Sequence, residues 1–454
     1  MIFLTVFSMS IMSTACGERD TEKKKDYTEL QKAISENAKK SELLTGELEN
    51  KKIKWLSSWD INTGNNDGKS TPAFLVAFQE RYGGEIEWYQ CTHEERYEQL
   101  AKSINGDEGI DFFYAGDSDA FPKGAVRSMF IPADDYINFT SPLWDGVREL
   151  NDTFLWNGRH YIISTRIAGD NCGVIYNRKT VREAGLSDPA ELYADGKWNW
   201  DTFEEMLKKF TDTENQRYGI DGWWFEFGLI ATTGIAPVSM ENGKLVSNIS
   251  GPAMERVQNR IYRLYQNDYI AIGSEAYGWN TKPANIGEGK TLFYPCGLYQ
   301  FYKSPTEWKR IFGEEAFFVP MPKDPESTEY YVPVGMEAYA FVKGGHNPEG
   351  VGKFLECKRF IMNDTETLAI ADRQMKEDYG WTDEMFSMKE SMQELAEKNT
   401  VIDISRGVSE DCGELLDNSL RLTARGTPWS ETYDSINAVV ERYIEEVNKN
   451  AGTE

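Results

Sequence analysis

The pattern of apolar and polar residues predicts alternating strands and helices at the start of the globular part of the chain. Strand-length apolar or alternating runs are separated by segments with helical spacing. The predicted order is a run at 53–60, a helix with Pro72 in its first turn, a strand at 85–90, a helix at 94–104 and a strand at 110–114. This order predicts a parallel sheet, whose strands all end at the same edge.

Polar and aromatic side chains follow two of these predicted strands. Trp59 and Asp60 end the first run, and Asp117 and Asp119 lie in the loop after the strand at 110–114. Ligands of open α/β sheets bind outside the carboxyl ends of the strands, so these side chains are candidate ligand contacts. The alternative, a solvated turn, is also compatible with these loop carboxylates.

A glycine-flanked apolar run at 285–299 predicts a second buried strand. Residues 291–294 are β-branched, aliphatic or aromatic, and Pro295 to Gly297 end the run abruptly. A strand that stops in such a loop presents its end, including Tyr299, at a surface. An ordinary core strand and turn is the alternative explanation.

The same run resembles a sequence motif of the extracellular solute-binding proteins of ABC sugar importers, the family that includes maltose-binding protein. The resemblance rests on Gly-Lys-Thr-Leu-Phe at 289–293 and Gly-Leu-Tyr at 297–299. Leu-Phe stands where the family has Ala-Met, and Tyr299 stands where it has Trp. The resemblance implies that Tyr299 stacks on a sugar.

Further motifs of this family follow in the same order along the chain. They are Asp-Phe-Phe-Tyr at 111–114, Asn-Gly-Arg-His-Tyr at 157–161, Gly-Val-Ile-Tyr-Asn-Arg at 173–178 and Val-Pro-Val-Gly-Met-Glu at 332–337. By this resemblance Asp170 occupies the place of a sugar-binding carboxylate of maltose-binding protein. Glu337 would lie at the mouth of the hinge, where a carboxylate reaches a hydroxyl.

The resemblance implies a two-lobed α/β fold of the type II periplasmic-binding-protein kind, with the ligand cleft between the lobes. The length after removal of the N-terminal segments, roughly 400 residues, also favours two lobes. We expect the N-terminal lobe to comprise 53–168 and 336–362, and the C-terminal lobe to comprise 169–335 and 363–454.

Three tryptophans in the second half are candidate ligand contacts. Trp223 and Trp224 are adjacent, so in an extended segment they would point to opposite faces and one would face the cleft. Trp279 lies between a tyrosine-glycine pair and an asparagine. Planar rings suit the apolar faces of sugars, although core or lobe packing explains such residues equally well.

The N-terminus resembles a bacterial lipoprotein signal. Residues 1–11 are largely apolar, and Ser-Thr-Ala-Cys-Gly at 13–17 resembles a lipobox, with Cys16 as the lipidated residue. The apolar stretch is too short to span a bilayer. Residues 17–52 are dense in Lys and Glu and predict a flexible tether, with a helix possible within 30–44.

Charge and composition exclude several classes of partner. A formal net charge of -25 argues against nucleic acid, because phosphate binding needs a basic surface. The chain has six cysteines without a CxxC pair and three scattered histidines, so no disulfide framework or metal site is predicted. We expect no metal or other cofactor, and a monomer.

The predicted function is that of the extracellular, lipid-anchored binding component of an ABC importer. It would bind a carbohydrate, most simply an oligosaccharide, and deliver it to separate permease subunits in the membrane. We expect no enzymatic activity. A peptide or modified-sugar ligand and a ligand-sensing receptor remain alternatives. An extracellular glycosidase would need an acid and a second carboxylate across a cleft.

Overall fold

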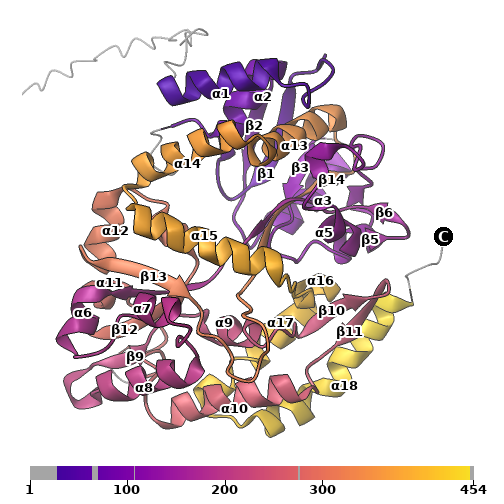
Figure 1. Cartoon of the computed structure of the whole chain (residues 1–454). Coiled ribbons are helices and arrows are strands. Elements are labelled where there is room, and N and C mark those ends of the chain that lie inside the picture. Colours follow the sequence, from indigo (N-terminus) through magenta and orange to yellow (C-terminus); the bar gives the residue numbers. More distant parts are fainter. Residues whose placement is uncertain (1–27, 64–69, 107, 275–276, 450–454) are drawn as a thin grey trace, which may run out of the picture.

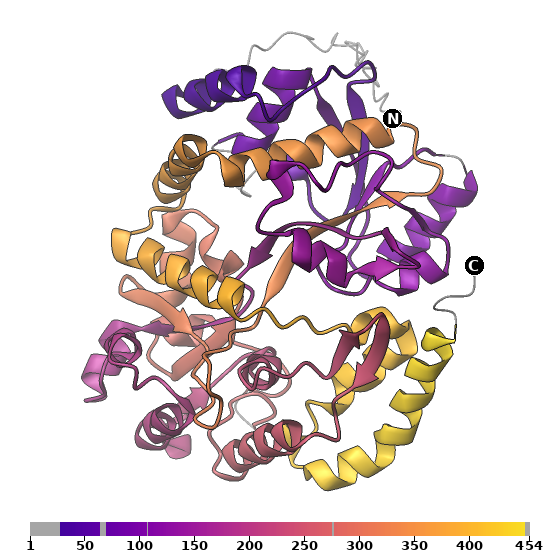
Figure 2. The same cartoon turned by 45° about the vertical axis from the view of Figure 1, so that its right-hand side comes forward.

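The computed structural model describes residues 28–63, 70–106, 108–274 and 277–449. The chain forms two lobes, each built on its own β-sheet (Figure 1). The predicted signal, Cys16 and the first part of the predicted tether lie outside the described residues. Figure 2 shows the same two lobes from the side, with α15 (Asp383–Lys398) crossing the space between them.

The sheet of the N-terminal lobe confirms the predicted order. Strands β1 (Lys52–Ser57), β2 (Glu85–Gln90) and β3 (Phe112–Tyr114) are parallel and are joined through α2 (Ala73–Tyr82) and α3 (Arg96–Gly106). Because parallel strands point the same way, the loops after β1 and β3 meet at one edge. That edge faces the other lobe.

The sheet is completed by strands that come from elsewhere in the chain. Strand β14 (Gly335–Val342) returns to this lobe and pairs antiparallel with β3, β4 (Phe130–Ile131) and β7 (Ile163–Ala168). Helix α13 (Pro348–Asn363) then packs on the sheet. The remaining elements of this part are α4 (Lys123–Val126), α5 (Arg148–Thr153), β5 (Leu155–Trp156) and β6 (Arg159–His160).

The helix considered within 30–44 is present, but the prediction that this part of the tether is flexible and solvated is wrong. Residues Glu29–Lys40 form helix α1, with a capping box between Thr28 and Gln31. Ile34 and Ala38, one helical turn apart, are fully buried in the core of the N-terminal lobe. Such a short apolar stripe is enough to fix a helix when a neighbouring helix, here α2, covers it.

The expected boundary at residue 363 falls one helix too early. Helix α14 (Thr365–Tyr379) packs against the N-terminal lobe, where Asn37 Nδ2 donates to Thr367 Oγ1 at 3.1 Å and Gln374 Nε2 donates to the Thr71 carbonyl at 3.1 Å. The chain passes to the other lobe only between α14 and α15.

The sheet of the C-terminal lobe has the order β13-β8-β12-β9. Strand β12 (Thr291–Cys296) lies inside it, antiparallel to β8 (Gly173–Asn177) and parallel to β9 (Tyr218–Ile220), and all of its residues are buried. Strand β13 (Ala316–Pro320) pairs with the other side of β8. Within the run at 285–299, the predicted strand is therefore a central one; it continues through Pro295 to Cys296, two residues beyond the predicted end, and its end faces the first lobe.

Helices surround this second sheet, together with a hairpin of β10 (Val238–Glu241) and β11 (Lys244–Ser247). The helices are α6 (Arg178–Glu183), α7 (Pro189–Ala194), α8 (Trp200–Phe210), α9 (Phe225–Ala231), α10 (Pro252–Gln266), α11 (Ala284–Gly287), α12 (Pro305–Phe312), α16 (Ser405–Val408), α17 (Glu410–Ser419) and α18 (Trp429–Asn448). Because α9 begins directly after Trp224, the segment around the tryptophan pair is not extended.

No disulfide forms among the described residues, where Cys91, Cys172, Cys296, Cys357 and Cys412 are all buried free thiols. Within the same ranges, no three His, Cys, Asp or Glu side chains gather in a way that could hold a metal ion. None of the described helices combines the length and apolarity needed to cross a membrane.

Candidate functional site

A cleft between the lobes contains two adjoining cavities. The first, which we call the hinge cavity, has a volume of about 260 Å³, and the second, the outer cavity, has about 390 Å³. Their linings share four residues, Gly116, Asp117, Asn171 and Gly335. The cavities are thus two compartments of one cleft, at the edge where strands of both sheets end, and their volumes suit a small-molecule ligand.

Aromatic rings from both lobes line the hinge cavity. Trp59, after β1, has 42% of its surface exposed, and Tyr299, after β12, has 48% exposed. The Trp59 ring is held edge-on by Trp55 at 5.4 Å and Tyr114 at 5.9 Å between centroids. Large rings are rarely left exposed singly in a cleft unless a ligand covers them.

The turn that places Tyr299 depends on Gly297. A β-carbon at this position would lie 2.9 Å from the Asn171 carbonyl oxygen and 2.7 Å from the Tyr299 ring itself. Only glycine therefore fits at this position, where the chain leaves β12 close to the segment that joins β7 to β8. The Tyr299 hydroxyl accepts a hydrogen bond from the Cys296 thiol at 3.5 Å, and the ring lines the hinge cavity.

The partly exposed Glu337 lines the hinge cavity and forms an ion pair with Lys358, which is buried behind it. The Glu337 carboxylate lies 2.6 Å from Lys358 Nζ and 3.7 Å from Arg166 Nε. Burial raises the pKa of Glu337, but the two cations outweigh burial and hold this pKa below its ordinary value. The register of β14 shifts between Glu337 and Ala338, so a bulge aims the side chains at this point of the strand.

Arg166 and Asp170 supply further polar groups to the same cavity. Asp170 accepts a hydrogen bond from the Tyr302 hydroxyl, and the Tyr302 ring stacks on Trp381 at 5.4 Å. Arg166 Nε is buried without a hydrogen-bond partner. A guanidinium with free donors beside a fixed carboxylate is suited to the hydroxyl groups of a ligand.

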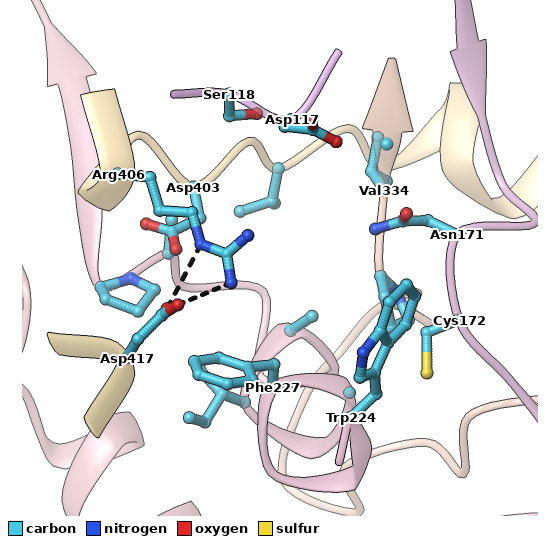
Figure 3. A pocket seen from close by; sticks show the side chains of 18 of the residues that line it. Asp117, Ser118, Asn171, Cys172, Trp224, Phe227, Val334, Asp403, Arg406 and Asp417 are labelled. Carbon is cyan, nitrogen blue, oxygen red and sulfur yellow. Dashed lines mark hydrogen bonds and ion pairs between the residues drawn. The ribbon is translucent and has the colours of Figure 1, made fainter. Parts of the chain in front are cut away.

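The outer cavity has a polar wall from one lobe and an apolar wall from the other. Figure 3 shows Asp117 and Ser118 on the side of the N-terminal lobe, with Trp224 and Phe227 opposite them. The Trp224 ring lies 5.9 Å from the Tyr299 ring, so the aromatic lining continues between the two cavities. The ion pair of Arg406 and Asp417, at 2.7 Å, closes one end.

Asp117 lies where the two cavities meet. Burial and the nearby Asp119 carboxylate raise the pKa of Asp117. Among the described residues, the only basic side chain within ion-pair distance is His93, with Nδ1 at 4.0 Å. The carboxylate therefore keeps acceptor capacity for a ligand.

The structure brings most of the predicted site residues into this cleft. Those that line it are Trp59, Asp117, Asp170, Trp224, Tyr299 and Glu337. The others line neither cavity. Asp60 accepts hydrogen bonds at 2.9 Å from the backbone and side chain of Asn62, and Asp119 is buried in an ion pair with Arg96. Trp223 and Trp279 lie beside the cleft, on the C-terminal lobe, in contact with Arg425.

Sequence reasoning missed several cleft residues, among them Arg166 and Tyr302, which line the hinge cavity. A signal for Arg166 existed, because a single arginine interrupts the otherwise uncharged strand at 163–168. Asn171, Arg406, Asp417 and Arg421 carried no such signal, since they come from loops and helices whose positions depend on the tertiary fold.

A helix start in the second lobe also differs from its prediction. From the sequence Trp-Asn-Trp-Asp-Thr-Phe-Glu at 198–204 alone, Asp201 is the expected N-cap, with Glu204 three residues later as its capping-box partner. The cap of α8 is instead Asn199, whose side chain accepts from the backbone of Asp201 and Thr202. Asp201 and Glu204 pair with Arg260 and Arg263 of α10. They therefore join two helices.

A buried carboxyl behind the outer cavity predicts pH-dependent stability. Glu226 is buried, its Oε2 has no hydrogen-bond partner, and Arg421 Nη1 lies 3.9 Å away. Burial raises the pKa of Glu226 from 4.5 to about 7, against the opposing effect of Arg421. A pKa raised by folding costs stability above the folded-state pKa, and this cost disappears as the pH falls to the unfolded-state value.

We therefore expect Glu226→Gln to be more stable than the wild type at about pH 8, by up to about 3 kcal/mol. The difference should vanish at about pH 4, where the wild-type carboxyl is protonated in both states. Urea unfolding of both proteins across this range measures the difference in free energy. A variant less stable than the wild type at high pH would show that the contact with Arg421 outweighs desolvation.

Comparisons with known proteins agree with this architecture. The family model for bacterial extracellular solute-binding proteins matches residues 62–357. A search among curated proteins finds no match. Among solved structures, an ABC substrate-binding protein from Listeria monocytogenes in complex with cycloalternan has a TM-score of 0.60 at 14% identity, over 90% of this chain and 99% of that chain.

Two further solved structures share the fold. The sugar-binding protein MalE from Xanthomonas citri has a TM-score of 0.61 at 14% identity, over 89% of this chain and 100% of that chain. UgpB from Mycobacterium tuberculosis, in complex with glycerophosphocholine, has a TM-score of 0.62 at 16% identity, over 87% and 99%. At such low identity these likenesses show the two-lobed fold and not the ligand.

Proposed function

Because the chain belongs to the family of bacterial extracellular solute-binding proteins, we propose that it binds a carbohydrate in the cleft between its lobes and delivers it to an ABC importer. One observation carries the choice of ligand. Exposed rings from opposite lobes, Trp59 and Tyr299, line the same cavity as the hydrogen-bonding groups of Arg166 and Asp170. A sugar-binding site needs both aromatic rings and hydrogen-bonding groups, because the faces of a sugar ring are apolar and its edges carry hydroxyls.

The shape of the cleft favours an oligosaccharide over a single sugar. The hinge cavity and the outer cavity adjoin, and the aromatic lining runs from Tyr299 to Trp224 across the boundary between them. A ligand with several rings would occupy both compartments. The structures from Listeria monocytogenes and Xanthomonas citri, a cycloalternan complex and a sugar-binding protein, support this choice by analogy.

The rest of the proposal concerns where the protein works and with what partners. Cys16, in its lipobox-like motif, would carry the lipid that holds a monomer at the outer face of the cell membrane. Membrane permease subunits, as separate polypeptides, would receive the carbohydrate. The protein itself would bind and release its ligand unchanged, without a cofactor.

A thermal-shift screen of residues 28–454 tests the ligand class. The screen would use mono- and oligosaccharides of several linkages, with short peptides and glycerophosphocholine as controls. A ligand that binds only the folded state raises the melting temperature, by an amount that grows with concentration above Kd. We expect a rise with one glycan series. A rise only with peptides or with glycerophosphocholine would refute the carbohydrate assignment.

A further inference from the structure

A group of two tryptophans and one arginine lies on the C-terminal lobe beside the cleft. The guanidinium carbon of Arg425 is 5.3 Å from the ring centre of Trp279 and 5.8 Å from that of Trp223. Trp279 has 57% of its surface exposed, more than any other large apolar side chain described as exposed. We call these three residues the outer platform. It lies outside both cleft cavities.

Within the part of the chain that the structure describes, Arg425 makes ring contacts that leave its hydrogen-bond donors unused. Among the described residues no carboxylate lies within ion-pair distance of its guanidinium, and its side chain makes no hydrogen bond to them. The neighbouring Arg421 differs, because it donates to the Trp223 carbonyl and approaches Glu226 at 3.9 Å. A guanidinium held beside exposed indole rings, with its five N–H donors free, offers both stacking and hydrogen bonding to a ligand.

The outer platform continues the cleft beyond the edge strand of the sheet. Trp223 is followed directly by Trp224, which lines the outer cavity, and Arg421, another residue of that lining, lies 5.9 Å from the Trp223 ring. The loop that carries Trp279 is fixed to the end of β9, since Asp221 accepts from the Lys282 backbone at 2.7 Å. The lining of the outer cavity is therefore linked to Trp279 by contacts, from Arg421 to Trp223 and from Trp223 through Arg425 to Trp279.

We propose that the outer platform binds the sugar units of a long saccharide that extend past the outer cavity. The inner units would lie in the cleft, and the outer units would stack on Trp279 and accept hydrogen bonds from Arg425. The inference rests on the proposed carbohydrate function, and it adds a preference for longer chains. Continuity with the cleft, together with the unused donors, distinguishes this occupant from a protein partner.

The test compares chain lengths on matched variants. The glycan series that binds the wild-type protein, among malto-, cello-, xylo-, manno- and galacto-oligosaccharides, is titrated calorimetrically as its disaccharide and as its longest soluble member. We expect Trp279→Ala to weaken binding of the long member about tenfold, as for loss of one aromatic contact, and to leave the disaccharide unchanged. Trp279→Phe keeps a ring and should retain most of the affinity. Arg425→Gln should show the same dependence on length.

The outcomes separate this inference from the function on which it rests. If long and short members bind the wild type but Trp279→Ala changes neither, the outer platform is not a saccharide site, while the carbohydrate function stands. An equal loss for both lengths would also overturn the inference, because it would place the effect in the cleft. If no saccharide binds at all, both proposals fail. Misfolding is not a concern for Trp279, whose side chain is largely exposed.

Discussion

Replacement of Lys358 by methionine is expected to lower the free energy of unfolding by about 2 kcal/mol, because it leaves the partly buried Glu337 carboxylate with too little compensating charge. Lys358 is buried, and its Nζ lies 2.6 Å from Glu337 and 3.5 Å from the centre of the Phe74 ring. Among the described residues, Arg166, at 3.7 Å, would remain as the only cation within ion-pair distance of Glu337. Because Arg166 still compensates part of the charge, the expected decrease in the free energy of unfolding is smaller than that for a fully buried ion pair that loses one partner.

The matched control removes the other half of the pair. Lys358→Met combined with Glu337→Gln eliminates the stranded charge, so the double variant should recover much of the lost stability. Urea unfolding monitored by tryptophan fluorescence measures all of these proteins. A single variant within about 1 kcal/mol of the wild type would show that Glu337 is solvated and that the ion pair does not support the hinge strand.

Tyr299→Ala is expected to weaken saccharide binding roughly a hundredfold, as for a central aromatic contact of a binding site. The Tyr299 ring is half exposed in the hinge cavity and lies 5.9 Å from the Trp224 ring of the outer cavity, so its loss opens a gap in the lining of the hinge cavity beside Trp224. Calorimetric titration with the saccharide found in the screen gives the ratio of dissociation constants.

Tyr299→Phe is the control for this experiment. It keeps the ring and removes only the hydroxyl, which accepts a hydrogen bond from the Cys296 thiol. The phenylalanine variant should therefore bind within a few-fold of the wild type. Equal weakening in both variants would mean that the hydroxyl, and not stacking, matters. Unchanged affinity in Tyr299→Ala would exclude Tyr299 from the site.

Much of the fold could be predicted because local patterns and global structure agree. The strands at 85–90 and 110–114 alternate with helices in a way that only a parallel sheet satisfies, and both occur as predicted. The run at 291–296 is buried on both faces, so its apolar character is continuous and easy to recognise. Because the ends of these strands could be predicted, Trp59, Asp117 and Tyr299 could be selected as candidate ligand contacts.

The errors arose where tertiary contacts decide the local structure. Helix α1 has a polar composition, and only the covering helix α2 gives its buried Ile34 and Ala38 a place to pack. The alternation that an extended segment would give Trp223 and Trp224 does not apply, because a helix, α9, starts after them. Asp119 looked like a loop carboxylate free for a ligand, but Arg96 from another element pairs with it.

The polar half of the site was the least predictable. The ion pair of Lys358 and Glu337 joins a helix to a strand. Arg166 and Asp170 line the same cavity as Glu337, at the point where the chain crosses between the lobes. The spacing of residues in the sequence does not predict these tertiary contacts, because each of the residues is also common at an exposed position of a helix, strand or loop. Aromatic residues were easier to select, since a ring in a loop after a strand is unusual without a function.

The central claim is that a saccharide binds between the lobes, and a crystal structure of the protein with the saccharide selected by the screen tests it most directly. We predict sugar rings against Tyr299 and Trp59, with hydroxyls within hydrogen-bond distance of Arg166 and Asp170. A saccharide bound elsewhere on the surface, with the hinge cavity filled only by solvent, would contradict the account.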